Sequence, residues 1–143
     1  MVRFSEDSSQ SQRGAAVVEF ALILPLLLLL LIGSIDLSIA LYDKAVITNA
    51  SREGARAGIV VRMPQVSEVE IRQVVLAHTQ DALLHFGSTK PLPAVSVEHG
   101  SLGVDPTLKV SVSYTFQGIG LGSLFSNLGQ PWVLKSSTVM VYE

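Results

Sequence analysis

The sequence contains no cysteine. Disulfide frameworks, thiolate nucleophiles and thiolate zinc sites are therefore excluded. Charge is also scarce, because 15% of the 143 residues are charged and the formal net charge is −2. Lys and Arg form no cluster longer than the stretch from Arg52 to Arg56. A chain that binds nucleic acid carries a basic patch or stripe, so we expect no nucleic-acid partner.

Patterns typical of enzymes are missing as well. The glycines between Gly118 and Gly122 are not followed by the Lys-Ser/Thr pair of a phosphate-binding loop, and no Ser occupies a G-x-S-x-G turn. Of the three histidines, His78, His85 and His99, the first two are seven residues apart, but no Cys and no well-spaced third ligand accompany them. We therefore expect no enzyme activity, no cofactor and no metal site.

A long apolar run from Ala15 to Ile35 dominates the sequence. As a helix it would be about 31 Å long, which matches the hydrocarbon thickness of a bilayer. We therefore expect a transmembrane helix over residues 15–35, preceded by a disordered, Ser- and Gln-rich leader over residues 1–14. Pro25 lacks the N–H of an intrahelical bond, so a helix kink is expected there. Basic residues are balanced on the two sides, so the positive-inside rule leaves the orientation open.

Helical periodicity continues beyond the apolar run, as far as Val61. Two apolar strips recur at three- and four-residue steps. One strip contains Ile39, Tyr42, Val46, Ala50, Ala57 and Val60, and the other contains Leu37, Leu41, Ala55 and Ile59. Two strips favour a helix that contacts both its own domain and a neighbouring subunit, and one broad face packed in a single core fits them equally well. Unbroken from Ala15 to Val61, the helix would be about 70 Å long, and Met63-Pro64 would close it.

A second, short helix is expected after that break. Ser67 and Glu70 have the spacing of a capping box, in which each residue satisfies an N–H group of the other. The helix should run to about Phe86, with Gly87 as its C-terminal cap.

The rest of the chain has the alternation of β-strands. Strands are expected around residues 95–97, over 109–116 and over 133–142, with a hairpin turn between the first two and a glycine-rich loop over 118–131. One face of the second strand would carry Val110, Val112, Tyr114 and Phe116. The expected fold class is therefore α+β: a long membrane-spanning helix packs through its C-terminal half on a head, residues 36–143, with a short helix and an antiparallel sheet of about three strands.

One carboxylate, Glu19, lies inside the apolar run. An ionised side chain costs roughly 2.5 to 3.5 kcal/mol at the centre of a span, so an intramembrane charge tends to have a partner. Cleavage between Gly14 and Ala15 would give Ala15 a free α-amino group, which is largely cationic at neutral pH. In a bundle of staggered helices, Glu19 of one subunit could neutralise the Ala15 amine of its neighbour. A misregistered subunit would leave a buried charge unpaired, so the pair would set register.

Gly14 directly precedes this cut, Glu19 is the fifth residue after it and Phe20 is the sixth. The arrangement resembles the class III signal of type IV pilins and pseudopilins. The resemblance implies an aspartyl prepilin peptidase that removes residues 1–14 on the cytoplasmic side of the bacterial inner membrane. It also implies that the N-terminus lies inside and the head outside, and that Phe20 and the Leu26–Leu31 block pack in a helical bundle.

A Leu-rich span with a proline leads into Asn-Ala-Ser-Arg-Glu-Gly-Ala-Arg, residues Asn49–Arg56. From Arg13 to Gly58 the chain resembles the TadE-like family of the tight-adherence (Flp) pilus system, whose members look like non-enzymatic minor pilins. The resemblance makes Arg52, Glu53 and Arg56 candidate contacts with the sheet or another subunit. A solvated charged turn with an ion pair between Glu53 and Arg56 is the alternative.

The resemblance implies a pilin-like fold and a minor pilin or pseudopilin that takes part in the assembly, initiation or tip formation of a Tad/Flp pilus used in adhesion. Its partners would be the prepilin peptidase, other pilins of the same fibre, a second minor pilin among them, the inner-membrane assembly platform and membrane lipid. The protein would begin as a single-pass inner-membrane protein and end in, or at the tip of, an extracellular pilus. An unprocessed single-span protein with an extracytoplasmic binding domain leaves Glu19 unexplained. A secretory signal cut near Ser38-Ile39-Ala40 would have a shorter apolar region.

Overall fold

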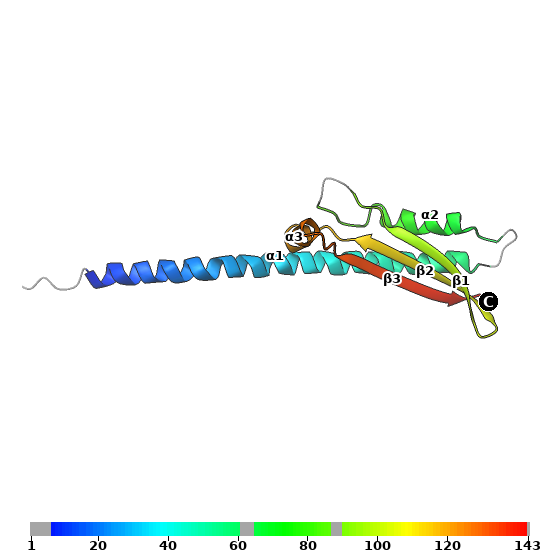
Figure 1. Cartoon of the computed structure of the whole chain (residues 1–143), viewed down its shortest axis with the longest axis horizontal. Helices are drawn as coiled ribbons and strands as arrows, with labels where there is room; N and C mark the ends of the chain where they lie inside the picture. Colours follow the sequence, from blue (N-terminus) through cyan, green and yellow to red (C-terminus); the bar gives the residue numbers. More distant parts are fainter. Residues whose placement is uncertain (1–6, 61–64, 87–89, 143) are drawn as a thin grey trace, which may run out of the picture.

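The computed structural model describes residues 7–60, 65–86 and 90–142 of the chain (Figure 1). Within these residues the elements follow in the order α1 (Asp7–Gly58), α2 (Glu68–Thr79), β1 (Ala94–Leu102), β2 (Asp105–Thr115), α3 (Leu121–Asn127) and β3 (Val133–Val141). The expected α+β class is confirmed: a long apolar helix, a short helix and a three-stranded antiparallel sheet pack together.

Helix α1 contains 52 residues, which corresponds to about 78 Å. Its first half projects from the head, and its second half lies along the sheet and α2 (Figure 1). The expectation of disorder up to Gly14 is wrong for Asp7–Gly14, which are helical. Once a helix has nucleated, each further residue at its end costs little. At the other end α1 stops at Gly58, earlier than the expected Val61. Met63-Pro64 lies outside the described residues.

The sheet has the order β1-β2-β3, with both pairs of strands antiparallel. The expected hairpin joins β1 to β2, because Leu102 pairs with Asp105 across a two-residue turn. Helices α1 and α2 pack on the same side of the sheet, and the core lies between the two layers (Figure 1). The predicted inward face of the second strand is confirmed, since its members are at most 1% exposed: Val110, Val112, Tyr114 and Phe116.

The buried face of α1 shares only Ala50 and Ala55 with the two apolar strips expected from the sequence. Its members recur at three- and four-residue steps and are mostly small or acidic: Asp36, Ala40, Asp43, Ile47, Ala50, Ser51, Gly54, Ala55 and Gly58. Tyr42 and Leu41, each from one expected strip, remain 48% and 63% exposed. Small residues are needed because the layers approach closely: a Cβ atom on Gly58 would lie 2.3 Å from Cδ2 of Leu108.

Helix α2 begins with the expected capping box. Ser67 Oγ accepts a hydrogen bond from the backbone N–H of Glu70 at 3.3 Å, and Glu70 Oε2 accepts one from the backbone N–H of Ser67 at 3.0 Å. Two of the N–H groups that a helix start leaves without intrahelical partners are thereby satisfied.

The end of α2 was predicted wrongly, because the helix stops at Thr79 and not near Phe86. The Thr79 hydroxyl donates to the carbonyl oxygen of Val75 at 3.0 Å. The chain then turns so that Leu83, 6% exposed, joins the core. Burial of this side chain outweighs continued helix formation, which intrinsic propensity favours only weakly. The expected cap, Gly87, lies outside the described residues.

Candidate functional site

The projecting half of α1 exposes a continuous apolar surface. An 18-residue window of the helix has a mean hydropathy of 2.8, and none of that window is buried within the chain. Leu22 is 72% exposed and Leu30 is 61% exposed. Within the described part of the chain, one helix is thus long and apolar enough to cross a membrane. A patch of this size needs lipid or other helices to cover it.

The residues predicted for cleavage and assembly lie on this exposed helix. Gly14, Ala15 and Glu19 are exposed, and Phe20 is 62% exposed. No other described residue forms a hydrogen bond or an ion pair with Glu19, so a partner for its charge must come from outside the described chain. Pro25 lies inside α1, which continues through it, and the kink expected there stays a prediction.

The Asn49–Arg56 motif divides into a buried and an exposed side. Arg52 and Arg56 are exposed, and Glu53 is half-buried. Among the described residues, Glu53 and Arg56 do not form the ion pair considered from the sequence. The buried side includes Ser51, whose hydroxyl lies 2.9 Å from the Oγ1 atom of Thr138 on β3. One side of the motif therefore holds the sheet, and its two arginines face away from the core.

Asp36, the first residue of the predicted head, is 1% exposed. Its carboxylate accepts hydrogen bonds of 2.8 to 3.4 Å from the backbone N–H groups of Ile119, Gly120 and Gly122. These N–H groups lie at the start of α3, whose N-cap residue, Gly120, makes no side-chain capping bond. The cap of α3 is thus a carboxylate from α1.

This contact explains another error in the sequence-based prediction. The stretch 118–131 was expected to be a loop, but it contains α3. A local capping side chain usually signals a helix start, and here the capping group lies 84 residues before Gly120. The close approach also requires glycine, because a Cβ atom on Gly120 would lie 2.1 Å from Cγ2 of Ile32. Sequence reasoning missed Asp36 for the same reason.

A second buried carboxylate, Asp43, lies about two turns further along α1. Its Oδ1 atom accepts the backbone N–H of Leu84 at 3.0 Å, and the carbonyl oxygen of Leu84 accepts the hydroxyl of Tyr114 at 3.1 Å. Helix α1 and strand β2 therefore hold the same residue of the segment after α2. The Oδ2 atom of Asp43 has no hydrogen-bond partner within the described chain.

Burial shifts the ionisation of both side chains that hold Leu84. It raises the pKa of Asp43 above its ordinary value, although the Leu84 N–H bond and the nearby His85 act in the opposite direction. Burial, with a smaller effect of the Asp43 carboxylate, raises the pKa of Tyr114 to about 12. The tyrosine therefore keeps its proton and donates to Leu84 across the physiological range.

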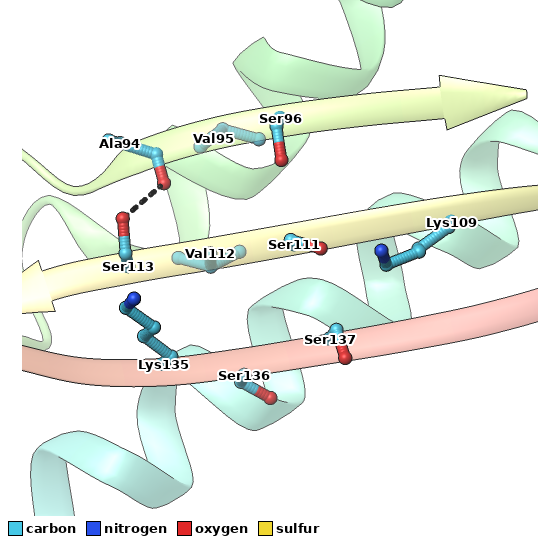
Figure 2. A pocket seen from close by; sticks show the side chains of 10 residues that line it. All are labelled: Ala94, Val95, Ser96, Lys109, Ser111, Val112, Ser113, Lys135, Ser136 and Ser137. Carbon is cyan, nitrogen blue, oxygen red and sulfur yellow. Dashed lines mark hydrogen bonds between the residues drawn. The ribbon is translucent and has the colours of Figure 1, made fainter.

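The side of the sheet away from the helices carries an open trough with a volume of about 460 Å³ (Figure 2). Polar side chains from all three strands line it: Ser96, Lys109, Ser111, Ser113, Lys135 and Ser137. Ser136 also borders it, but its hydroxyl lies on the other side of the sheet, 3.3 Å from Oγ of Ser51 on α1. Neither His, Asp nor Glu belongs to this lining, and the neighbouring carboxylate of Glu98 accepts a hydrogen bond from Nζ of Lys109 at 3.0 Å. As for metal binding, the described residues include no group of three or more His, Cys, Asp or Glu placed to hold a metal ion.

A comparison with protein families decides how the helix is interpreted. The model of the family described as TadE-like protein matches residues 14–56. Residues 14–56 are TadE-like. The resemblance to the TadE-like family is therefore confirmed over the segment that contains the apolar span, Asp36, Asp43 and the Asn49–Arg56 motif. No curated protein and no solved structure matches the chain.

The TadE-like segment indicates a protein associated with a Tad pilus, and the family is not known for enzymatic activity. The match begins at Gly14 and ends at Arg56, before α2 and the sheet. The matched residues therefore coincide with the part of α1 that contains the exposed span and the residues that contact the head.

Asp36→Asn should loosen the start of α3. An amide keeps one oxygen acceptor but places an NH2 donor against backbone N–H donors, so at least one of them loses its partner. We expect the head to lose about 1 to 3 kcal/mol of stability, with faster amide hydrogen exchange at Ile119, Gly120 and Gly122 than in wild type. Asp105→Asn, at an exposed carboxylate, is the control and should change neither quantity. Unchanged exchange at the three amides of Asp36→Asn would contradict the capping role.

Asp43→Asn tests the burial of the second carboxylate through pH. Because the folded-state pKa of Asp43 is raised, the folded protein binds this proton more tightly than the unfolded chain does. The contribution to stability is complete below the ordinary pKa of 3.8 and is lost as the pH rises through the raised value. Relative to the variant, wild type should lose about 1.4 kcal/mol for each pH unit by which the two pKa values differ. Urea unfolding in detergent at several pH values measures this, and a pH-independent difference would argue against it.

Proposed function

We propose that this protein is a minor pilin or pseudopilin of a Tad/Flp pilus, cleaved after Gly14 by a prepilin peptidase. The observation that carries the proposal is Glu19, an exposed carboxylate within an apolar span whose charge has no partner in the described chain. The TadE-like match that begins at Gly14 supports the same cleavage position. Cleavage there supplies a cation, the α-amino group of Ala15, four residues before the carboxylate.

This charge pair would determine how subunits align. Ala15 and Glu19 are separated by about 6 Å along a helix axis, a little over one turn. The amine of one subunit and the carboxylate of its neighbour therefore meet when the two helices are offset by that distance. In a bundle without water, any other offset leaves a desolvated charge unpaired, at a cost of several kcal/mol. The first turns of the mature helix thus select one register.

The covered and uncovered faces of α1 support a role inside a fibre. The head occupies one face of the helix from Asp36 onwards, whereas Leu37, Leu41 and Tyr42 remain exposed. Together with the exposed Arg52, they form a surface for neighbouring pilins, a second minor pilin among them. The N-terminus would lie in the cytoplasm and the head outside, first at the inner-membrane assembly platform and then in, or at the tip of, the fibre.

The trough on the sheet favours a second function, an unprocessed membrane tether with an extracytoplasmic binding domain. Its lysines, and its serines other than Ser136, offer hydrogen-bond donors on the side of the sheet that no helix covers (Figure 2). In this alternative the chain keeps residues 1–14, and the carboxylate of Glu19 has no role.

Gly14→Val should abolish cleavage, because the branched side chain replaces the glycine that precedes the cut. Mass spectrometry of the protein from its native membrane should find wild type beginning at Ala15 and the variant retaining residues 1–14. Gly33→Val makes the same exchange elsewhere in α1 and should be processed normally. If wild type itself retains its first fourteen residues, the tether becomes the better explanation.

Glu19→Ala should be cleaved but poorly incorporated into fibres. Loss of the carboxylate leaves a neighbouring amine unpaired, so we expect at least about tenfold less variant than wild type in sheared fibres by quantitative immunoblotting. Glu19→Gln keeps the shape without the charge and should fail to a similar degree. Glu98→Ala removes an exposed carboxylate of the head and serves as the control. Normal amounts of Glu19→Gln in normal fibres would refute the charge pair.

A further inference from the structure

The segment around α3 exposes apolar side chains and carries no charge. We call residues 118–132 the α3 segment. Four of its apolar side chains are exposed, to fractions between 39% and 69%: Ile119, Leu124, Leu128 and Trp132. The sequence contains no charged residue between Lys109 and Lys135. Surface segments of a soluble head normally include charges, so this composition requires an explanation.

Two contacts fix the height of the α3 segment along α1. The Asp36 carboxylate holds the backbone at the start of α3 through bonds of 2.8 to 3.4 Å. Gly120 packs against Ile32, where there is no space for a Cβ atom. Ile32 lies in the last turn of the expected span, residues 15–35, and Asp36 is the first residue after that span. In Figure 1, α3 is accordingly the part of the head nearest to the projecting half of α1.

We propose that the α3 segment is a second membrane contact, which lies in the headgroup region of the bilayer that α1 spans. This inference rests on the membrane span of the proposed function and goes beyond it. Apolar side chains at that depth enter the boundary between headgroups and acyl chains, and tryptophan is enriched there. Because the segment contains no Lys or Arg, its attraction is apolar and requires no anionic lipid. The partner that we assign to the α3 segment is therefore the lipid surface.

Trp132 provides a direct probe of this contact. It is the single tryptophan of the chain. Its position is fixed, because its carbonyl oxygen accepts the backbone N–H of Phe116 at 2.8 Å and the two rings meet edge to face with centroids 5.5 Å apart. The quenching of its fluorescence therefore reports the depth of the segment and not the motion of a loose side chain.

The hairpin between β1 and β2 offers a matched control at the opposite end of the sheet (Figure 1). Leu102 is 72% exposed and Val104 is 96% exposed. These side chains are as apolar and as accessible as those of the α3 segment, but they lie far from the span. Replacing them with glutamine removes exposed apolar surface without touching the proposed contact.

The experiment places the full-length chain in phosphatidylcholine vesicles, with part of the lipid brominated either near the headgroup end or near the middle of the acyl chains. We expect blue-shifted Trp132 emission, with quenching at least about twofold stronger by the shallow bromines than by the deep ones. Adding anionic lipid or salt should leave the quenching unchanged. Leu124→Gln with Leu128→Gln should reduce the quenching at least about twofold, and Leu102→Gln with Val104→Gln should leave it at the wild-type level.

Several results would overturn the inference. Vesicle flotation tests membrane insertion of α1 separately from the contact of the α3 segment. A chain that does not float with the vesicles lacks a membrane span, and the inference then fails together with the proposed function. A chain that floats with Trp132 unquenched by either lipid overturns the membrane contact alone. Blue-shifted emission that is unquenched and depends on the ratio of protein to lipid assigns the α3 segment to a second copy of the chain and also overturns it. Equal quenching in both double variants excludes Leu124 and Leu128 as the contact.

Discussion

The buried carboxylate of Asp36 is the interaction on which the arrangement of this molecule depends. A carboxylate removed from water is destabilising unless hydrogen bonds replace its hydration, and backbone N–H groups at the start of α3 supply them. The same bonds satisfy donors that a helix start leaves free. The hydrogen bonds therefore offset the cost of burying both the carboxylate and the backbone N–H groups. Because Asp36 directly follows the apolar span, the contact also fixes the head at the point where α1 would leave the membrane.

The two halves of α1 meet different requirements. Within the projecting half, residues 15–35 are apolar apart from Glu19 and Ser34, which suits lipid or a bundle of like helices. The other half packs through small and acidic residues, which let the sheet and α2 approach closely. Asp43 extends the same principle, since it and Tyr114 hold Leu84 from two elements. A single continuous helix thus carries both a surface for a nonpolar environment and the attachment of a folded domain.

The features that sequence analysis predicted correctly are those with local or periodic signals. The apolar span needs only length and hydropathy, the start of α2 needs only Ser67 and Glu70, and the inward face of β2 follows from alternation. The buried face of α1 was predicted only in part, because hydrophobic periodicity finds Ala50 and Ala55 but does not register aspartate, serine and glycine. Helix α3 was missed because its capping group is distant in the sequence, and the end of α2 because burial of Leu83 overrode local propensity. Within the site, Glu19 stands out as the one carboxylate in an apolar run, whereas Asp36 becomes recognisable only when the start of α3 is placed beside it.

The continuity of α1 couples two directions that would otherwise be independent. Glu19 and the sheet are attached to the same helix, so the azimuth of the carboxylate around the helix axis is tied to the azimuth of the open, serine-lined face. Each residue added between them would rotate one against the other by about 100° and displace them by about 1.5 Å. The neighbouring subunit whose amine pairs with Glu19 therefore also determines the direction in which the serine-lined face points around the fibre axis.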